Sequence, residues 1–74
     1  MLANQVVHSD PEIMSGVPVF VGTRVPLRAL IDHLEAGDPL EVFLHSFPSV
    51  TRDQAVAAIE LAGDLLAEAA STHR

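Results

Sequence analysis

Apolar residues recur at helical spacing along the second half of the chain, beginning at residue 27. Positions three and four residues apart form one apolar face, made of Leu27, Leu30, Ile31 and Leu34. Pro26 suits a helix start, because its missing N–H has no intrahelical partner there, and Gly37 suits a helix end. The spacing therefore predicts a helix over 26–36, with Arg28 and Asp32 together on its opposite side.

A second, shorter helix is predicted directly after this glycine. Asp38 is placed to cap the free N–H groups, Pro39 occupies the first turn, and Glu41 can reach back to Asp38. Its apolar face consists of Leu40, Phe43, Leu44 and Phe47. Pro48 ends this helix.

The longest helix is predicted from Thr51 to about Ser71. Thr51 and Gln54 have the spacing of a capping box. The inward apolar face is Ala55, Ile59, Ala62, Leu66 and Ala69, beside a second row of Ala58, Leu61 and Leu65. The polar side carries only acids, namely Asp53, Glu60, Asp64 and Glu68. This apolar arc is wider than one small core requires, so we expect another chain to cover part of it.

The first half of the chain has the pattern of a β-hairpin. Residues 5–8 and 17–21 are strand candidates, separated by turn signals at 9–11 and at Ser15 and Gly16. Pro18 cannot donate a ladder hydrogen bond and indicates an edge strand. The predicted fold class is mainly α: a three-helix, helix-turn-helix (homeodomain-like) bundle over 27–74 with an N-terminal β-hairpin arm over 1–26, together forming one domain.

Composition favours a protein that binds other macromolecules. The chain has 74 residues and no cysteine, yet 49% of its residues are hydrophobic. Small domains at this length often associate, so we expect a homodimer. All four basic residues are arginines, and the net charge is −6, which suits a basic protein partner better than a phosphate backbone. Neither a membrane span nor a signal peptide is indicated, so we expect a cytoplasmic protein.

No arrangement of residues predicts catalysis, a cofactor or a metal site. His8, Asp10 and Glu12 are close in sequence, but a polar turn is the preferred interpretation. His33 and His45 lie on polar sides of the short helices and are expected to be solvated. The acids of the last helix resemble a solvated face rather than an acid–base pair, because nothing promises the burial that separates two pKa values. We therefore expect no enzyme.

Residues 22–26, Gly-Thr-Arg-Val-Pro, stand where the predicted strand becomes a helix. The forked donors of Arg24 could bind a phosphate or a partner carboxylate. Alternatively, Arg24 could bond backbone carbonyls and tie the hairpin to the helix, and this structural role is slightly favoured.

The chain resembles the family called domain of unknown function 433. The likeness covers about residues 6–63 and rests on residues 10–26, on the glycine and capped helix at 37–41, on residues 47–51 and on the alanine-rich run at 55–62. Ser15 stands where that family usually has glycine, and Val17 where a basic residue is common. The resemblance implies a homeodomain-like fold and a predicted antitoxin, often encoded beside a PIN-like ribonuclease toxin.

Two functions remain open at this point. As an antitoxin of a type II toxin–antitoxin pair, the chain would neutralise the toxin through Glu60, Asp64, Leu65, Leu66, Glu68 and Ala69. As a stand-alone helix-turn-helix transcriptional regulator, it would contact operator DNA through Arg24, Arg28, Thr51, Arg52 and Gln54. The antitoxin is the leading hypothesis, and autoregulation by DNA binding is compatible with it.

Overall fold

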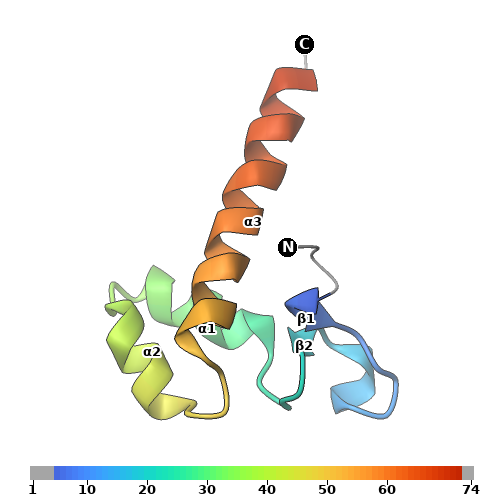
Figure 1. Cartoon of the computed structure of the whole chain (residues 1–74), viewed down its shortest axis with the longest axis vertical. Helices are drawn as coiled ribbons and strands as arrows, with labels where there is room; N and C mark the ends of the chain where they lie inside the picture. The colour runs from blue at the N-terminus through green and yellow to red at the C-terminus, as the bar shows by residue number, and fades with distance from the viewer. Residues whose placement is uncertain (1–4, 73–74) are drawn as a thin grey trace.

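The fold is mainly α, with three helices following an N-terminal two-stranded sheet, which confirms the predicted class. The computed structural model describes residues 5–72, with side chains through residue 70. The elements in chain order are β1 (Val7–His8), the 3₁₀ turn η2 (Met14–Gly16), β2 (Val19–Phe20), α1 (Leu27–Glu35), α2 (Leu40–Ser46) and α3 (Arg52–Thr72). In Figure 1 the other elements gather around the first turns of α3, and the rest of α3 projects away from them.

The hairpin is shorter than predicted, and the segment before α1 lies along the outer side of its second strand. β1 and β2 pair antiparallel, with Val7 opposite Phe20. On its other side β2 is bridged to the segment before α1: the Phe20 N–H donates to the Val25 carbonyl at 3.0 Å, and the Leu27 N–H donates to the Pro18 carbonyl at 2.9 Å. This position uses a backbone carbonyl as acceptor and no N–H as donor, so proline, which lacks an N–H, can occupy it.

The predicted turn at Ser15 and Gly16 is confirmed and has a left-handed backbone. Met14, Ser15 and Gly16 have φ values of 50°, 58° and 87°. Two of these residues carry a Cβ, which makes that conformation unfavourable. The turn is closed by the Gly16 N–H, which donates to the Ile13 carbonyl at 3.1 Å.

α1 ends as predicted, but Asp38 does not cap α2. Gly37 has φ 83°, and the Asp38 N–H returns to the His33 carbonyl at 3.0 Å, which satisfies the helix end. The Asp38 carboxylate lies 2.9 Å from His33 Nδ1, and no side chain caps α2. Glu41, predicted to reach back to Asp38, pairs with Arg52 instead.

His33 is only partly exposed, where the sequence predicts a solvated side chain, whereas His45 is exposed as expected. The His33 side chain is 23% exposed. Its ring stands edge-on to the rings of Phe43 and Phe47, with centroids 5.8 and 6.0 Å away. The aromatic side chains of α2 therefore draw His33 into the α1–α2 contact, and Asp38 provides its polar partner.

The predicted capping box starts α3 and also joins it to the hairpin. The Gln54 N–H donates to Thr51 Oγ1 at 3.1 Å, and the Thr51 N–H donates to Gln54 Oε1 at 3.0 Å. The remaining polar atom of Gln54, Nε2, donates to the Val21 carbonyl at 2.8 Å, across 33 residues of sequence. One side chain thus fixes both the start of α3 and its position against the hairpin.

A single core serves both the hairpin and the helices. It contains buried residues from the hairpin, the segment before α1 and all three helices or their approaches: Val6, Phe20, Val25, Leu30, Phe43, Val50 and Ala55. The hairpin therefore shares its core with the helices through Val6 and Phe20. Among the described side chains of α3, Ala55 alone is fully buried.

We expect Gln54→Ala to destabilise the fold more than Thr51→Ala does. Thr51→Ala removes the cap, a loss of about 1 kcal/mol. Gln54→Ala also leaves the Val21 carbonyl without its partner, for a total of about 2–3 kcal/mol. Urea denaturation followed by far-UV circular dichroism measures both losses. Equal losses would show that the bond to Val21 contributes nothing.

Candidate functional site

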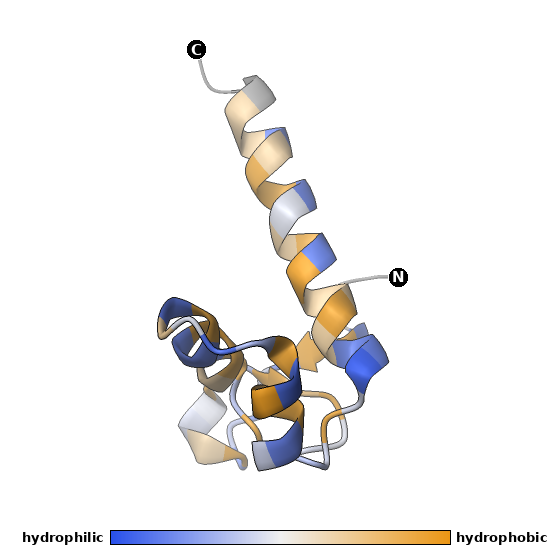
Figure 2. Ribbon diagram, turned by 90° about the vertical axis from the view of Figure 1, so that its left-hand side faces the viewer, coloured by the Kyte–Doolittle hydropathy of each residue, from blue (hydrophilic) through white to orange (hydrophobic). Residues whose placement is uncertain are grey.

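The projecting half of α3 exposes large apolar side chains. Leu65 is 63% exposed and Leu66 is 71% exposed, so Leu66, which the periodicity assigned to the inward face, does not reach the core. Ile59 is 41% exposed. The periodicity was therefore right about the face, but the core covers only its first part. Figure 2 shows apolar and polar bands on different sides of α3, continuing well beyond the body.

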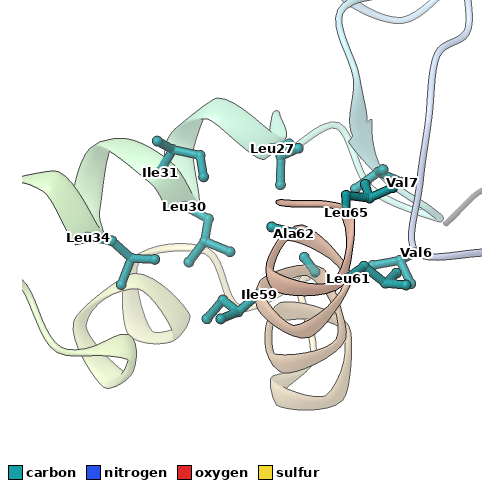
Figure 3. A pocket seen from close by; sticks show the side chains of 11 residues that line it. Val6, Val7, Leu27, Leu30, Ile31, Leu34, Ile59, Leu61, Ala62 and Leu65 are labelled. Atoms are coloured by element: carbon teal, nitrogen blue, oxygen red, sulfur yellow. The ribbon is translucent and has the colours of Figure 1, made fainter. Parts of the chain in front are cut away.

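An apolar groove continues this exposed face towards the body. Figure 3 shows the groove lying between the side chains of α1 and those of α3, with Val6 and Val7 at one end. The lining residues are Val6, Val7, Leu27, Leu30, Ile31, Leu34, Ala58, Ile59, Leu61, Ala62 and Leu65. Its volume is about 230 Å³. Pockets for drug-sized ligands are larger, about 300–1,000 Å³, so this groove suits one or two side chains of a macromolecule.

Leu65 belongs to both features. It lines the groove, and it is also one of the two most exposed leucines of the projecting half. The groove and the exposed α3 residues are therefore one surface, which we call the α3 face and define as the groove residues together with Leu66 and Ala69. Isolated exposed apolar residues are ordinary, but a contiguous apolar surface indicates a contact site.

The acidic residues of α3 flank this face. Glu60 and Asp64 are exposed and line a shallow hollow together with Ala57 and Leu61. Leu61 also lines the apolar groove, so the acidic and apolar surfaces meet along one side of the helix. Glu68 lies one turn beyond Asp64 and is also exposed. A partner that covers the α3 face would meet these carboxylates at its rim.

The structure brings the six predicted toxin-contact residues together. All six are exposed on consecutive turns of α3, and they are Glu60, Asp64, Leu65, Leu66, Glu68 and Ala69. Sequence reasoning missed the other half of the surface, which α1 and the hairpin contribute. The signal for Leu27, Ile31 and Leu34 was present in the periodicity of the first helix, but it was assigned wholly to the core.

Four of the five predicted DNA-contact residues are engaged within the chain. Arg28 binds Asp32 and Glu35 at 2.9 and 2.8 Å, and Arg52 pairs with Glu41. The side-chain groups of Thr51 and Gln54 are used by the capping box and by the Val21 carbonyl. The ion pairs are exposed and worth little to stability, but they neutralise the cations that phosphate binding would use.

Arg24 differs from these residues. It is exposed, and within residues 5–72 its guanidinium has no hydrogen-bond or ion-pair partner. The structural role predicted for it is therefore wrong. Thr23 performs that role: its hydroxyl donates to the Phe20 carbonyl at 2.8 Å and accepts from the Val25 N–H at 3.0 Å.

In the part of the chain that the structure describes, no group of three histidine, cysteine or acidic side chains is placed to hold a metal ion. His8, Asp10 and Glu12 accordingly do not form one. The Asp10 carboxylate instead accepts the Glu12 N–H at 2.9 Å, as expected for a polar turn. Among the described helices, none has the length and apolarity needed to cross a membrane.

The sequence has relatives among known proteins. A family model described as "Protein of unknown function (DUF433)" matches residues 7–62, which confirms the resemblance seen in the sequence. The chain is also 36% identical over 52 residues to "Uncharacterized protein y4eO" of Sinorhizobium fredii (strain NBRC 101917 / NGR234). That match covers 70% of this chain and 24% of the relative, so the chain spans about a quarter of the relative's length. No solved structure matches.

We expect the amides of the projecting half of α3 to exchange with solvent faster than those of its first half. Residues 64–70 are exposed, whereas Ala55, Ala57 and Ala58 pack against the body. Local opening is easiest where tertiary contacts are few. Hydrogen exchange followed by NMR at micromolar concentration should show about tenfold faster exchange over 64–70. Equal protection along α3 would mean that another copy covers the α3 face at that concentration.

Proposed function

This chain belongs to the DUF433 family, and from that membership and the exposed α3 face we propose that it is the antitoxin of a type II toxin–antitoxin pair. In this role it neutralises a PIN-like ribonuclease toxin by protein–protein binding in the bacterial cytoplasm. The antitoxin role itself comes from the family resemblance. The observation that supports the antitoxin role in this chain is the exposure of Leu65 and Leu66, which are 63% and 71% exposed beside an apolar groove.

The energetics favour a partner that covers both leucines. Burying two leucine side chains contributes roughly 3–6 kcal/mol before the entropy losses of association. Insertion of a partner side chain into the groove between α1 and α3 adds to this contribution, because its walls are aliphatic. These residues can therefore act as the central anchor of an interface, surrounded by weaker contacts.

Charge indicates the chemistry of the partner. The carboxylates at the rim of the α3 face, together with a net charge of −6, favour approach by a basic surface. A ribonuclease must bind a polyanion, so the region around its active site is expected to be basic. Covering such a region with acids would also compete with RNA. A second copy of this chain would instead bring like charges together, which makes a homodimer through the α3 face the weaker proposal.

We predict that Leu65→Asp combined with Leu66→Asp abolishes co-purification with the toxin encoded in the adjacent reading frame. The change replaces the apolar anchor with two carboxylates, and we expect affinity to fall by more than about a hundredfold. Co-expression with a tagged toxin, followed by affinity capture and calorimetric titration, measures this loss.

The matched control is Val56→Asp combined with Ala67→Asp. It adds the same two charges to α3 on the side away from Leu65, at exposed positions that do not line the groove and are not three or four residues from Leu65 or Leu66. We expect this variant to retain most of the binding, and circular dichroism should show that both variants keep α3. A Leu65/Leu66 variant that still binds as tightly as the control would reject the α3 face as the toxin-binding surface.

Operator binding by the chain alone is the weaker alternative: the helix-turn-helix succession favours it, and the paired arginines oppose it. With Arg28 and Arg52 held by acids, we predict that the chain alone does not retard a fragment of its own promoter at about 150 mM salt, since too few cations are free for counterion release. Gel shifts with and without the toxin test this. Tight binding by the chain alone would favour the stand-alone regulator over the antitoxin.

A further inference from the structure

Arg24 is held outward by a rigid turn rather than by contacts of its own. The Thr23 N–H donates to the Phe20 carbonyl at 3.0 Å, and Gly22 supplies the positive φ of 79° that this tight turn requires. Thr23 is buried, and its hydroxyl bonds the backbone on both sides of Arg24. The backbone that carries the guanidinium is therefore fixed before any ligand arrives.

A mostly apolar hollow adjoins this arginine. Arg24 lines it together with Ile13 and Phe47 from distant parts of the chain, and with Val25 and Pro26 from its own segment. His8 and Ser49 contribute polar groups to the lining. A guanidinium carried by a fixed backbone at the edge of an apolar hollow is a combination that a purely structural arginine does not need. It can bind a carboxylate while the hollow accepts a neighbouring apolar side chain.

The charges of the chain make this arginine exceptional. Of the three arginines within the described residues, Arg28 and Arg52 are paired with acids of the chain and Arg24 is not. The hydrogen-bond donors of the Arg24 guanidinium are therefore unused, although the chain has ten acidic residues. A guanidinium left unpaired in such a chain is available to a carboxylate from outside.

The lining distinguishes a peptide from a nucleic acid. Phosphate backbones are bound by clusters of cations, and here a single free guanidinium lines a hollow together with the apolar residues Ile13, Val25 and Phe47. We therefore propose that the Arg24 hollow is a second docking site, which binds an acidic residue flanked by apolar residues in an extended segment of a partner protein. This site is separate from the α3 face, shares no lining residue with the groove, and does not depend on the antitoxin role.

A short peptide tests the site directly. The probe is the acetylated and amidated tripeptide Leu-Asp-Leu, titrated into the isotope-labelled full chain and followed by NMR. Shifts should centre on the amides of residues 22–25 and on Ser49, with a dissociation constant of roughly 1 mM, as expected for a few contacts on a small ligand. The Leu-Asn-Leu peptide, which lacks the charge, should bind at least about tenfold more weakly.

Two arginine variants provide the matched comparison. Arg24→Gln should bind the Leu-Asp-Leu peptide at least about tenfold more weakly than the unmodified chain does. Arg28→Gln removes the same charge from a neighbouring exposed position that is already paired, and it should leave peptide binding unchanged. Arg24 makes no contact that holds the fold, and the ion pairs of Arg28 are exposed and contribute little, so both variants should melt within about 2 °C of the unmodified chain.

The other outcomes overturn the proposal. Equal binding of the Asp and Asn peptides would mean that the hollow recognises only apolar groups. Equal losses in Arg24→Gln and Arg28→Gln would mean that overall charge, and not this site, attracts the peptide. Absence of shifts at about 10 mM peptide, or shifts at residues 22–25 produced by a DNA duplex and not by the peptide, would assign Arg24 elsewhere.

Discussion

The contact between the first turn of α3 and the hairpin is the constraint on which the rest of the molecule depends. Gln54 caps α3 and bonds the Val21 carbonyl, and beside it Val50 and Ala55 enter the common core. α3 has 21 residues, so an anchor at its first turn leaves much of its length without support from the body. The projection visible in Figure 1 follows from where the anchor lies.

Local signals were sufficient to predict the helices, because residues close to several of the helix ends determine where those helices begin or end. The glycine turn after α1 and the Thr51–Gln54 capping box are examples, and both were predicted from the sequence. How far along α3 the core extends could not be predicted from local signals. Ala55 and Leu66 belong to the same periodic face, yet one is fully buried and the other is 71% exposed. Only the position of the body relative to the helix distinguishes them.

Side-chain partners were harder to predict than elements. Asp38 and Glu41 had the right spacing for a cap, but tertiary neighbours competed more effectively: His33 for Asp38, and Arg52 for Glu41. The sequence likewise identified residues 22–26 as unusual and then assigned the backbone-bonding role to Arg24 instead of Thr23. The shorter side chain performs it, because a hydroxyl one bond from Cβ can reach the carbonyl three residues back and the N–H two residues ahead.

The anchored first half of α3 also explains how its far half can present an ordered binding surface. A free helix of about ten residues is marginal in water, because nucleation is unfavourable. Here the capping box and the buried first turns provide the nucleus, and each later turn needs only propagation. Residues 64–70 include two leucines, three alanines and a glutamate, which are strong helix formers. A face that is helical before the partner arrives loses less entropy on binding, so a small chain can use exposed leucines efficiently.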